Sequence, residues 1–295
     1  MSTEVSPKPA TNRPDIAAYL QANWIPIVAW IAFAYYWVPT FQYFLKAWDN
    51  PDGYYSHGYL IPFMSGFTAW LLRNKAAQMQ VRPSSITIIG LIIVLTLATV
   101  AGIQNSQTVR GLMFPLSLSL FLAVIYGWNY VRLFVFPIFY LYFLCPIPEF
   151  ILLPLSFKIQ YYSTIIATYM AKAMGTDAIR IGQYAIETSY VNIEVGNECS
   201  GFRMLVALTA FAVFLVYAVK GEVWRKLLFV FISMPLAVLV NSLRIALLVA
   251  VGHYWDASMV PVLHDYSGYA VLVVAFILMY WIARLLGCRD FRLTQ

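Results

Sequence analysis

The chain has 295 residues, of which 61% are hydrophobic and only 11% are charged, and its formal net charge at pH 7 is +6. A soluble domain typically has about a quarter charged residues, so a chain with this balance needs lipid to cover much of its apolar surface. The composition therefore predicts an integral membrane protein and excludes a soluble globular enzyme. The basic residues lie in short loops rather than in one stripe, which argues against a nucleic-acid partner.

Eight apolar segments are long enough to cross a bilayer, which takes about 20 residues of helix. In chain order they lie near 24–45, 57–72, 85–103, 112–127, 131–147, 203–219, 227–252 and 266–286. The sequence thus predicts an all-α polytopic membrane protein with about eight transmembrane helices in one domain at 24–287. A polar tail at 1–23, which has no signal-peptide core, and a basic tail at 288–295 flank this domain.

The distribution of charge predicts that both ends of the chain are cytoplasmic. With the N-terminus inside, the inner segments contain most of the basic residues, namely Lys8, Arg13, Arg73, Lys75, Arg82, Arg132, Lys220, Arg225, Lys226, Arg284, Arg289 and Arg292. The outer segments contain most of the acidic ones, among them Glu187, Glu194 and Glu198. This asymmetry follows the rule that Lys and Arg concentrate in cytoplasmic loops.

Two outer segments are predicted between the fifth and sixth spans. The stretch 150–174 has apolar residues at helical spacing and polar residues such as Gln160 elsewhere, which predicts an amphipathic helix lying in the outer interface. A ninth span here would move Glu187 inside and Lys220 outside, against the charge rule. Residues 179–196 alternate in the manner of short strands and predict a small extracytoplasmic hairpin that leads to Cys199.

The cysteines do not predict a metal site or a disulfide framework. Cys145, Cys199 and Cys288 are far apart in the chain and odd in number, and no CxxC pattern is present. Cys145 and Cys288 have no ionisable cluster beside them, so we interpret both as small apolar residues. Neither a metal nor another cofactor is expected.

Ionisable residues at membrane depth are costly, so Arg203 and Arg244 are functional candidates. Arg203 follows Cys199 by four residues, and a helix that begins at Cys199 would place both side chains on one face. Asn241 lies one turn before Arg244, and His264 opens the last predicted span at its outer end. Cys199, Arg244 and His264 are therefore all predicted in the outer leaflet.

These residue types suit nucleophilic catalysis by a thiolate. A helix N-terminus or a nearby cation lowers the pKa of a cysteine from its usual value near 8.5. An arginine stabilises a thiolate or an oxyanion, and a histidine exchanges protons. Each residue also has a plainer explanation: Cys199 as a small apolar residue, Arg203 and Arg244 as side chains that reach the interface, and His264 as a helix cap. Position does not separate His264 from His57, because both are predicted on the outer side.

Three local sequences resemble the exosortase/archaeosortase family. They are Glu198-Cys199-Ser200-Gly201-Phe202-Arg203, then Asn241-Ser242-Leu243-Arg244-Ile245, then His264 before a span. The earlier Tyr55-Ser56-His57-Gly58, with Pro62, is similar to a further feature of the family. The resemblance covers about residues 40–287.

The resemblance implies a bacterial exosortase of the short, single-domain form, located in the inner membrane with its active site facing the periplasm. The implied activity is that of a cysteine endopeptidase or transpeptidase. It would cleave a C-terminal PEP-type sorting signal of secreted proteins and transfer the new C-terminus to an acceptor. The implied partners are these secreted substrates, membrane lipid and the acceptor, with no nucleic acid.

The resemblance also assigns roles to residues. Cys199 matches the nucleophile, Arg244 the catalytic arginine and His264 the third catalytic residue. Residues that position these groups or bind the substrate are then expected among Arg203, Asn241, Glu198, Ser200, Gly201 and His57.

Two other functions remain open from the sequence. One is a transporter or a scaffold in exopolysaccharide export, although the chain has no convincing repeat and its polar cluster lies toward one face rather than at the midplane. The other is a membrane acyltransferase that uses Cys199 or His264 on a lipid. An acyltransferase would give a lipid-linked product and would not depend on a peptide motif.

Overall fold

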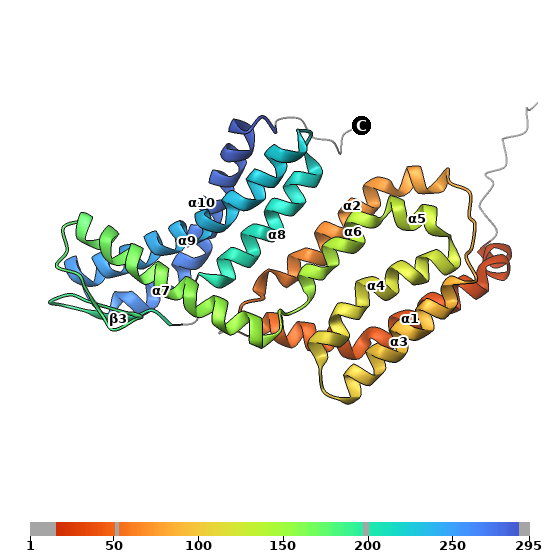
Figure 1. Ribbon diagram of the computed structural model, residues 1–295, viewed down its shortest axis with the longest axis horizontal. Coiled ribbons are helices and arrows are strands. Elements are labelled where there is room, and N and C mark those ends of the chain that lie inside the picture. The colour runs from red at the N-terminus through yellow and green to blue at the C-terminus, as the bar shows by residue number, and fades with distance from the viewer. Residues whose placement is uncertain (1–15, 51–52, 197–200, 289–295) are drawn as a thin grey trace, which may run out of the picture.

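The computed structural model describes residues 16–50, 53–196 and 201–288. In these ranges long helices are joined by short connections, and one small sheet lies at one end of the molecule (Figure 1). Helices from the first half of the chain gather at the other end, so chain order is largely preserved in space (Figure 1).

The first half begins with four long helices joined by short connections. They are α1 (Ile16–Asp49), α2 (Leu60–Ala77), α3 (Thr87–Ile103) and α4 (Gln107–Ile125), with a 3₁₀ turn η1 (Ser56–Tyr59) before α2. Aromatic side chains of α1 pack into α4, where the rings of Phe33 and Phe121 stack at 4.4 Å. Each of these helices overlaps one of the first four predicted spans.

The fifth predicted span, at 131–147, is broken rather than continuous. It consists of α5 (Trp128–Leu133), α6 (Val135–Tyr140) and the 3₁₀ helix η2 (Leu141–Leu144). Pro137 explains the break, because it has no N–H to donate to the carbonyl of Leu133 and therefore sits in the first turn of a new helix.

Helix α7 (Glu149–Ala173) has its polar side buried and its apolar side exposed. Ser156 and Gln160 are at most 5% exposed, whereas Phe150 and Tyr169 are at least 71% exposed. The amphipathic pattern thus reflects packing of the polar side against protein, and not a polar face turned to water. The helix is long and apolar enough to cross a membrane, yet it runs across the direction of α2 and α8 in Figure 1. Its interfacial position stays a prediction.

The strands predicted at 179–196 are confirmed and form a three-stranded antiparallel sheet. Its strands are β1 (Ile179–Ile181), β2 (Ala185–Glu187) and β3 (Asn192–Glu194), in the order β1-β2-β3. Several contacts fix the sheet to the helices. The buried Gln160 amide of α7 donates to the carbonyl of Val195, and His253 pairs with Asp177 at 3.1 Å. The pKa of the Asp177 carboxyl is lowered, first by hydrogen bonds from Ser189.

The last three helices pack side by side, with α9 in contact with both α8 and α10. They are α8 (Phe202–Ala218), α9 (Val223–Tyr254) and α10 (Met259–Leu285). One predicted boundary is wrong: α10 begins at Met259 and not near 266, so His264 lies inside the helix rather than at its start. Helix α8 begins at Phe202, within one residue of the predicted 203. The hypothesis that a helix begins at Cys199 and shares one face with Arg203 concerns a residue that lies outside the described ranges.

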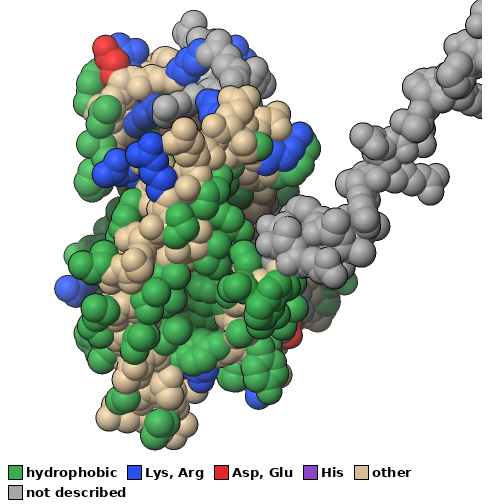
Figure 2. Space-filling view, turned by 90° about the vertical axis from the view of Figure 1, so that its right-hand side faces the viewer, with side chains coloured by type: hydrophobic (Ala, Val, Ile, Leu, Met, Phe, Trp, Pro, Cys, Tyr) green, Lys and Arg blue, Asp and Glu red, His purple; other side chains and the backbone are tan. Residues whose placement is uncertain are grey.

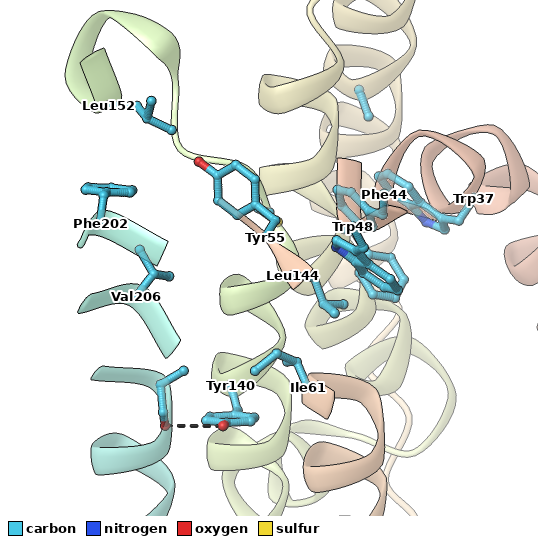
Figure 3. Packing of buried hydrophobic residues seen from close by; sticks show 14 of the residues in the cluster. Trp37, Phe44, Trp48, Tyr55, Ile61, Tyr140, Leu144, Leu152, Phe202 and Val206 are labelled. Carbon is cyan, nitrogen blue, oxygen red and sulfur yellow. Dashed lines mark hydrogen bonds between the residues drawn. The ribbon is translucent and has the colours of Figure 1, made fainter. Parts of the chain in front are cut away.

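The two halves share an aromatic core. Tyr140 of α6 is fully buried and donates its hydroxyl to the carbonyl of Ala210 on α8 at 3.2 Å (Figure 3). Nearby, Phe136 of α6 stacks on Tyr217 of α8 with ring centroids 3.6 Å apart. Phe202, the first residue of α8, is fully buried in the same cluster (Figure 3).

The exposed surface is largely apolar. Figure 2 shows hydrophobic side chains over much of one face, with Lys and Arg gathered mostly toward one end. Among the described residues, five helices are long and apolar enough to cross a membrane, and three shorter apolar helices accompany them. The five are α1 (from Trp24), α4, α7, α9 and α10. The predicted number of eight crossings and their orientation stay predictions.

Candidate active site

The candidate site is built on one face of α9. Asn241 and Arg244 lie one helical turn apart, so their side chains leave the helix on the same side. Asn241 is 1% exposed and Arg244 is 7% exposed. A guanidinium keeps its charge even when it is buried, so burial at this level requires hydrogen-bond partners.

Arg244 finds those partners on α10. Its Nε donates to Ser267 Oγ at 3.0 Å, and its Nη2 donates to the carbonyl oxygen of His264 at 2.7 Å. Ser267 Oγ also donates to the same carbonyl at 3.2 Å. The guanidinium is therefore oriented by α10, and it lies beside the backbone of the histidine that the sequence analysis selected.

Asn241 faces the start of α8. Gly201, the residue before α8, has φ +81, in the left-handed region that favours glycine. A Cβ at Gly201 would lie 3.0 Å from Nδ2 of Asn241. A larger residue here would thus be strained in its backbone and tight against α9. Two of the predicted positioning residues, Gly201 and Asn241, are in direct proximity.

The predicted nucleophile Cys199 and its neighbours Glu198 and Ser200 lie outside the described residues. Gly201 follows Cys199 by two positions in the sequence. Gly201 is thus the first described residue after Cys199, and it lies beside Asn241. The other two cysteines, Cys145 and Cys288, are both buried.

The Tyr55-Ser56-His57-Gly58 motif forms the turn η1 between α1 and α2. The Tyr55 hydroxyl accepts a hydrogen bond from the Ile147 N–H at 2.8 Å. Gly58 lies under the Trp48 ring, where a Cβ would come within 2.2 Å of Nε1. These contacts give Tyr55 and Gly58 structural roles: they hold the turn against α1 and against the segment before α7.

The turn η1 lies near the beginning of α8, where His57 is close to Arg203. Burial, and next the positive charge of Arg203, lower the pKa of His57 to about 4. His57 is therefore neutral at neutral pH. The adjacent Tyr54 ring meets Phe202 edge to face, with centroids 5.3 Å apart. His57 and Arg203 thus lie close together at the beginning of α8.

A pocket opens between β3, α9 and the beginning of α10. Its volume is about 590 Å³, which is within the range of ligand-binding clefts. Its lining residues are Tyr190, Val191, Asn192, Ile193, Glu194, Val195, Ile245, Leu248, Ala257, Val260, Pro261 and His264. His264 thus connects the pocket to Arg244, whose guanidinium binds the carbonyl of His264.

Ser267 and the pocket were not predicted from the sequence. Ser267 lies three residues after His264, and this helical spacing would have identified it once α10 was known to include both. The pocket had no such signal, because it depends on how the sheet sits against α9 and α10.

Comparison with known protein families shows to which family the chain belongs. The family model described as transmembrane exosortase matches residues 48–281. The chain belongs to the transmembrane exosortase family. A search of curated proteins and a search of solved structures each found no match. The matched range contains every exosortase-like motif quoted above, from Tyr55 to His264, and membership makes this chain a multi-pass membrane protein.

Proposed function

We propose that this exosortase family member is a cysteine-dependent endopeptidase and transpeptidase. It cleaves a C-terminal sorting segment of secreted proteins at the outer face of the bacterial inner membrane. The observation that carries the proposal is the buried Arg244, held by Ser267 and by the carbonyl of His264 next to a pocket of peptide size. A buried, oriented cation beside a histidine suits an acyl-transfer site.

The first chemical step is attack of the Cys199 thiolate on a peptide carbonyl. The sulfur forms a bond to the carbonyl carbon, and the carbonyl oxygen becomes an oxyanion. Arg244 stabilises this oxyanion: only two of its five N–H donors take part in the bonds to α10 given above. Arg203, in the first turn of α8, adds a second positive charge at this end of the site that favours the thiolate.

Proton transfer is assigned to His264. His264 first takes the proton of the Cys199 thiol and becomes an imidazolium. When the oxyanion re-forms the C=O bond and the peptide C–N bond breaks, this imidazolium gives the proton to the leaving amine, and a thioester remains on Cys199. His264 then removes a proton from the incoming nucleophile, either water or the amine of an acceptor, which attacks the thioester. His57 suits this role less well, because its pKa near 4 leaves it with little tendency to hold a proton.

The predicted membrane orientation agrees with the same proposal. A substrate with an apolar helix and a basic tail would keep the tail in the cytoplasm, by the rule that places the basic loops of this chain there. The bond to be cleaved would then emerge at the outer surface. There, in the predicted orientation, lie the sheet, the first turns of α10 and Cys199.

The test is the processing of a tagged secreted protein that carries a Pro-Glu-Pro segment, an apolar helix and a basic tail. It is co-expressed with the wild type, with Cys199→Ala or with Cys288→Ala as the matched control, because Cys288 is only 4% exposed. Intact mass should show a shortened product with the wild type and with Cys288→Ala only. A further mass on the new C-terminus identifies the acceptor.

Two results would contradict the proposal. Shortening that persists with Cys199→Ala excludes a cysteine nucleophile at this position. A product that carries lipid and forms without the Pro-Glu-Pro segment favours the acyltransferase alternative instead.

A further inference from the structure

The strand β3 has an open edge, and its backbone groups on that edge can be assigned from the register. The Val195 N–H donates to the carbonyl of Tyr184 at 2.7 Å, and the Thr188 N–H donates to the carbonyl of Val191 at 2.8 Å. In an antiparallel pair, hydrogen-bonded and non-hydrogen-bonded residue pairs alternate. Val191, Ile193 and Val195 therefore point their backbone N–H and C=O groups toward β2.

The same alternation turns the other residues of β3 outward. Asn192 and Glu194 stand opposite Glu187 and Ala185 in non-hydrogen-bonded pairs. Their N–H and C=O groups consequently point away from β2, to the side where no further strand of this sheet lies. Exposed edge groups of this kind are a template for pairing with another extended chain.

Asn192 and Glu194, whose backbone groups form this open edge, line the 590 Å³ pocket. The lining also includes Val260, Pro261 and His264 of α10, and Ile245 and Leu248 of α9. The pocket, called the trough below, therefore combines the outward backbone donors and acceptors of β3 with largely apolar side chains. Arg244 binds the carbonyl of His264, which lines the trough.

We propose that the substrate binds in this trough as an added β-strand, with its backbone paired to Asn192 and Glu194. The inference rests on the proposed peptidase function, and it specifies how the peptide is held. Strand addition supplies affinity through main-chain hydrogen bonds, whereas side-chain pockets at alternate positions supply selectivity. His264 also lines the trough, and its carbonyl accepts a hydrogen bond from Arg244, so a peptide held there lies next to His264 and the group that Arg244 binds.

A peptide with alternating prolines fits this mode of binding. Proline has no N–H and is tolerated in a strand only where that N–H would face away from the partner. In a Pro-Glu-Pro segment the glutamate N–H and C=O pair with β3, and both prolines fall at outward positions with period two. A second copy of the chain could pair with this edge only by inserting an extended segment of its own into the trough.

The other edge of the sheet provides a matched control. Arg180 of β1 pairs with Ile186, a residue whose backbone groups bond to β3, so Arg180 also points its N–H outward. Arg180 does not line the pocket. The same substitution at Arg180 or at Asn192 thus alters one outward-pointing N–H at an edge of the same sheet. Only Asn192 lines the trough.

The experiment replaces Asn192 or Arg180 with the photo-crosslinker p-benzoylphenylalanine in full-length protein that carries Cys199→Ala. The protein is co-expressed with the tagged Pro-Glu-Pro substrate and irradiated. We expect a substrate adduct from position 192 and at least ten times less from position 180. No adduct at 192, equal adducts at both positions, or an adduct with a second copy of the chain overturns the inference.

A rate measurement complements the cross-linking in the active protein. Asn192→Pro, compared with Asn192→Ala, removes one backbone donor and should slow processing by up to about ten-fold. Arg180→Pro, compared with Arg180→Ala, should not slow it. Cross-linking does not require catalysis. If no adduct forms although processing depends on Cys199, only the binding mode is refuted. If processing does not depend on Cys199, the proposed function is refuted instead.

Discussion

Arg244→Lys tests whether the buried guanidinium takes part in catalysis or only joins α9 to α10. The lysine keeps the positive charge but donates from a single nitrogen, so it cannot bind Ser267 Oγ and the His264 carbonyl with the fork of an arginine. At least one of the two hydrogen bonds is lost. Loss of one hydrogen bond to a charged group costs about 1.5–3 kcal/mol. If Arg244 also stabilises the oxyanion, the rate of processing falls by about 100- to 1,000-fold.

Ser267→Ala separates these two effects. It removes the acceptor of Nε and leaves the guanidinium in place, so it should cost stability of the same order while slowing processing less than about ten-fold. The assay is the initial rate of substrate shortening by purified protein, followed by intact mass, together with thermal unfolding in detergent. Equal rate losses in Arg244→Lys and Ser267→Ala, at equal loss of stability, would refute a catalytic role for Arg244 and leave it as a structural contact between α9 and α10.

Gly58→Ala and His57→Gln test the packing and electrostatics around η1, and Gly66→Ala is the control for the first. Gly58→Ala forces a Cβ to within 2.2 Å of the Trp48 ring and should destabilise the protein by about 1–3 kcal/mol. Gly66→Ala in α2 meets nothing within 4 Å and should stabilise the helix by about 0.5–1 kcal/mol; equal thermal shifts for the two variants would contradict this account. The pKa of His57 is lowered from 6.5 to about 4, so the unfolded chain binds the proton more readily than the folded one. Stability is therefore complete above pH 6.5 and falls as the pH drops toward 4, by about 2 kcal/mol between pH 7 and 5. His57→Gln should remove this part of the pH dependence, and an unchanged pH profile of unfolding would contradict it.

The regular elements were largely predictable because their signals are local. The period-two alternation of 179–196 predicted strands, and the structure confirms them and adds a third. Apolar length located helices at all eight predicted spans. The break between α5 and α6 was missed, although Pro137 marks it, because an apolar run conceals a proline when hydropathy is averaged.

The candidate site was only partly predictable, because its geometry comes from packing between distant segments. Sequence selected Arg244 and His264, but the bond between them uses the His264 carbonyl, which no side-chain pattern reveals. The side chains of Cys199 and Arg203 were expected on one face of a helix that begins at Cys199. Gly201 adopts a left-handed conformation and α8 starts after it, and Cys199 itself lies outside the described residues. The pocket required three elements to meet and has no local signal.

The inverted faces of α7 bear on how the protein is assembled. Ser156 donates to the hydroxyl of Tyr54, and the Gln160 amide donates to the carbonyl of Val195, so both partners are made before α9. Ser163 is also buried, and α7 packs along α9, which the ribosome makes later. Hydroxyl and amide groups facing lipid without partners are costly. The polar side of α7 is therefore covered in stages, and α9 covers the last of it. A chain truncated before α9 would leave the side of α7 that packs on α9 uncovered and open to quality-control proteases.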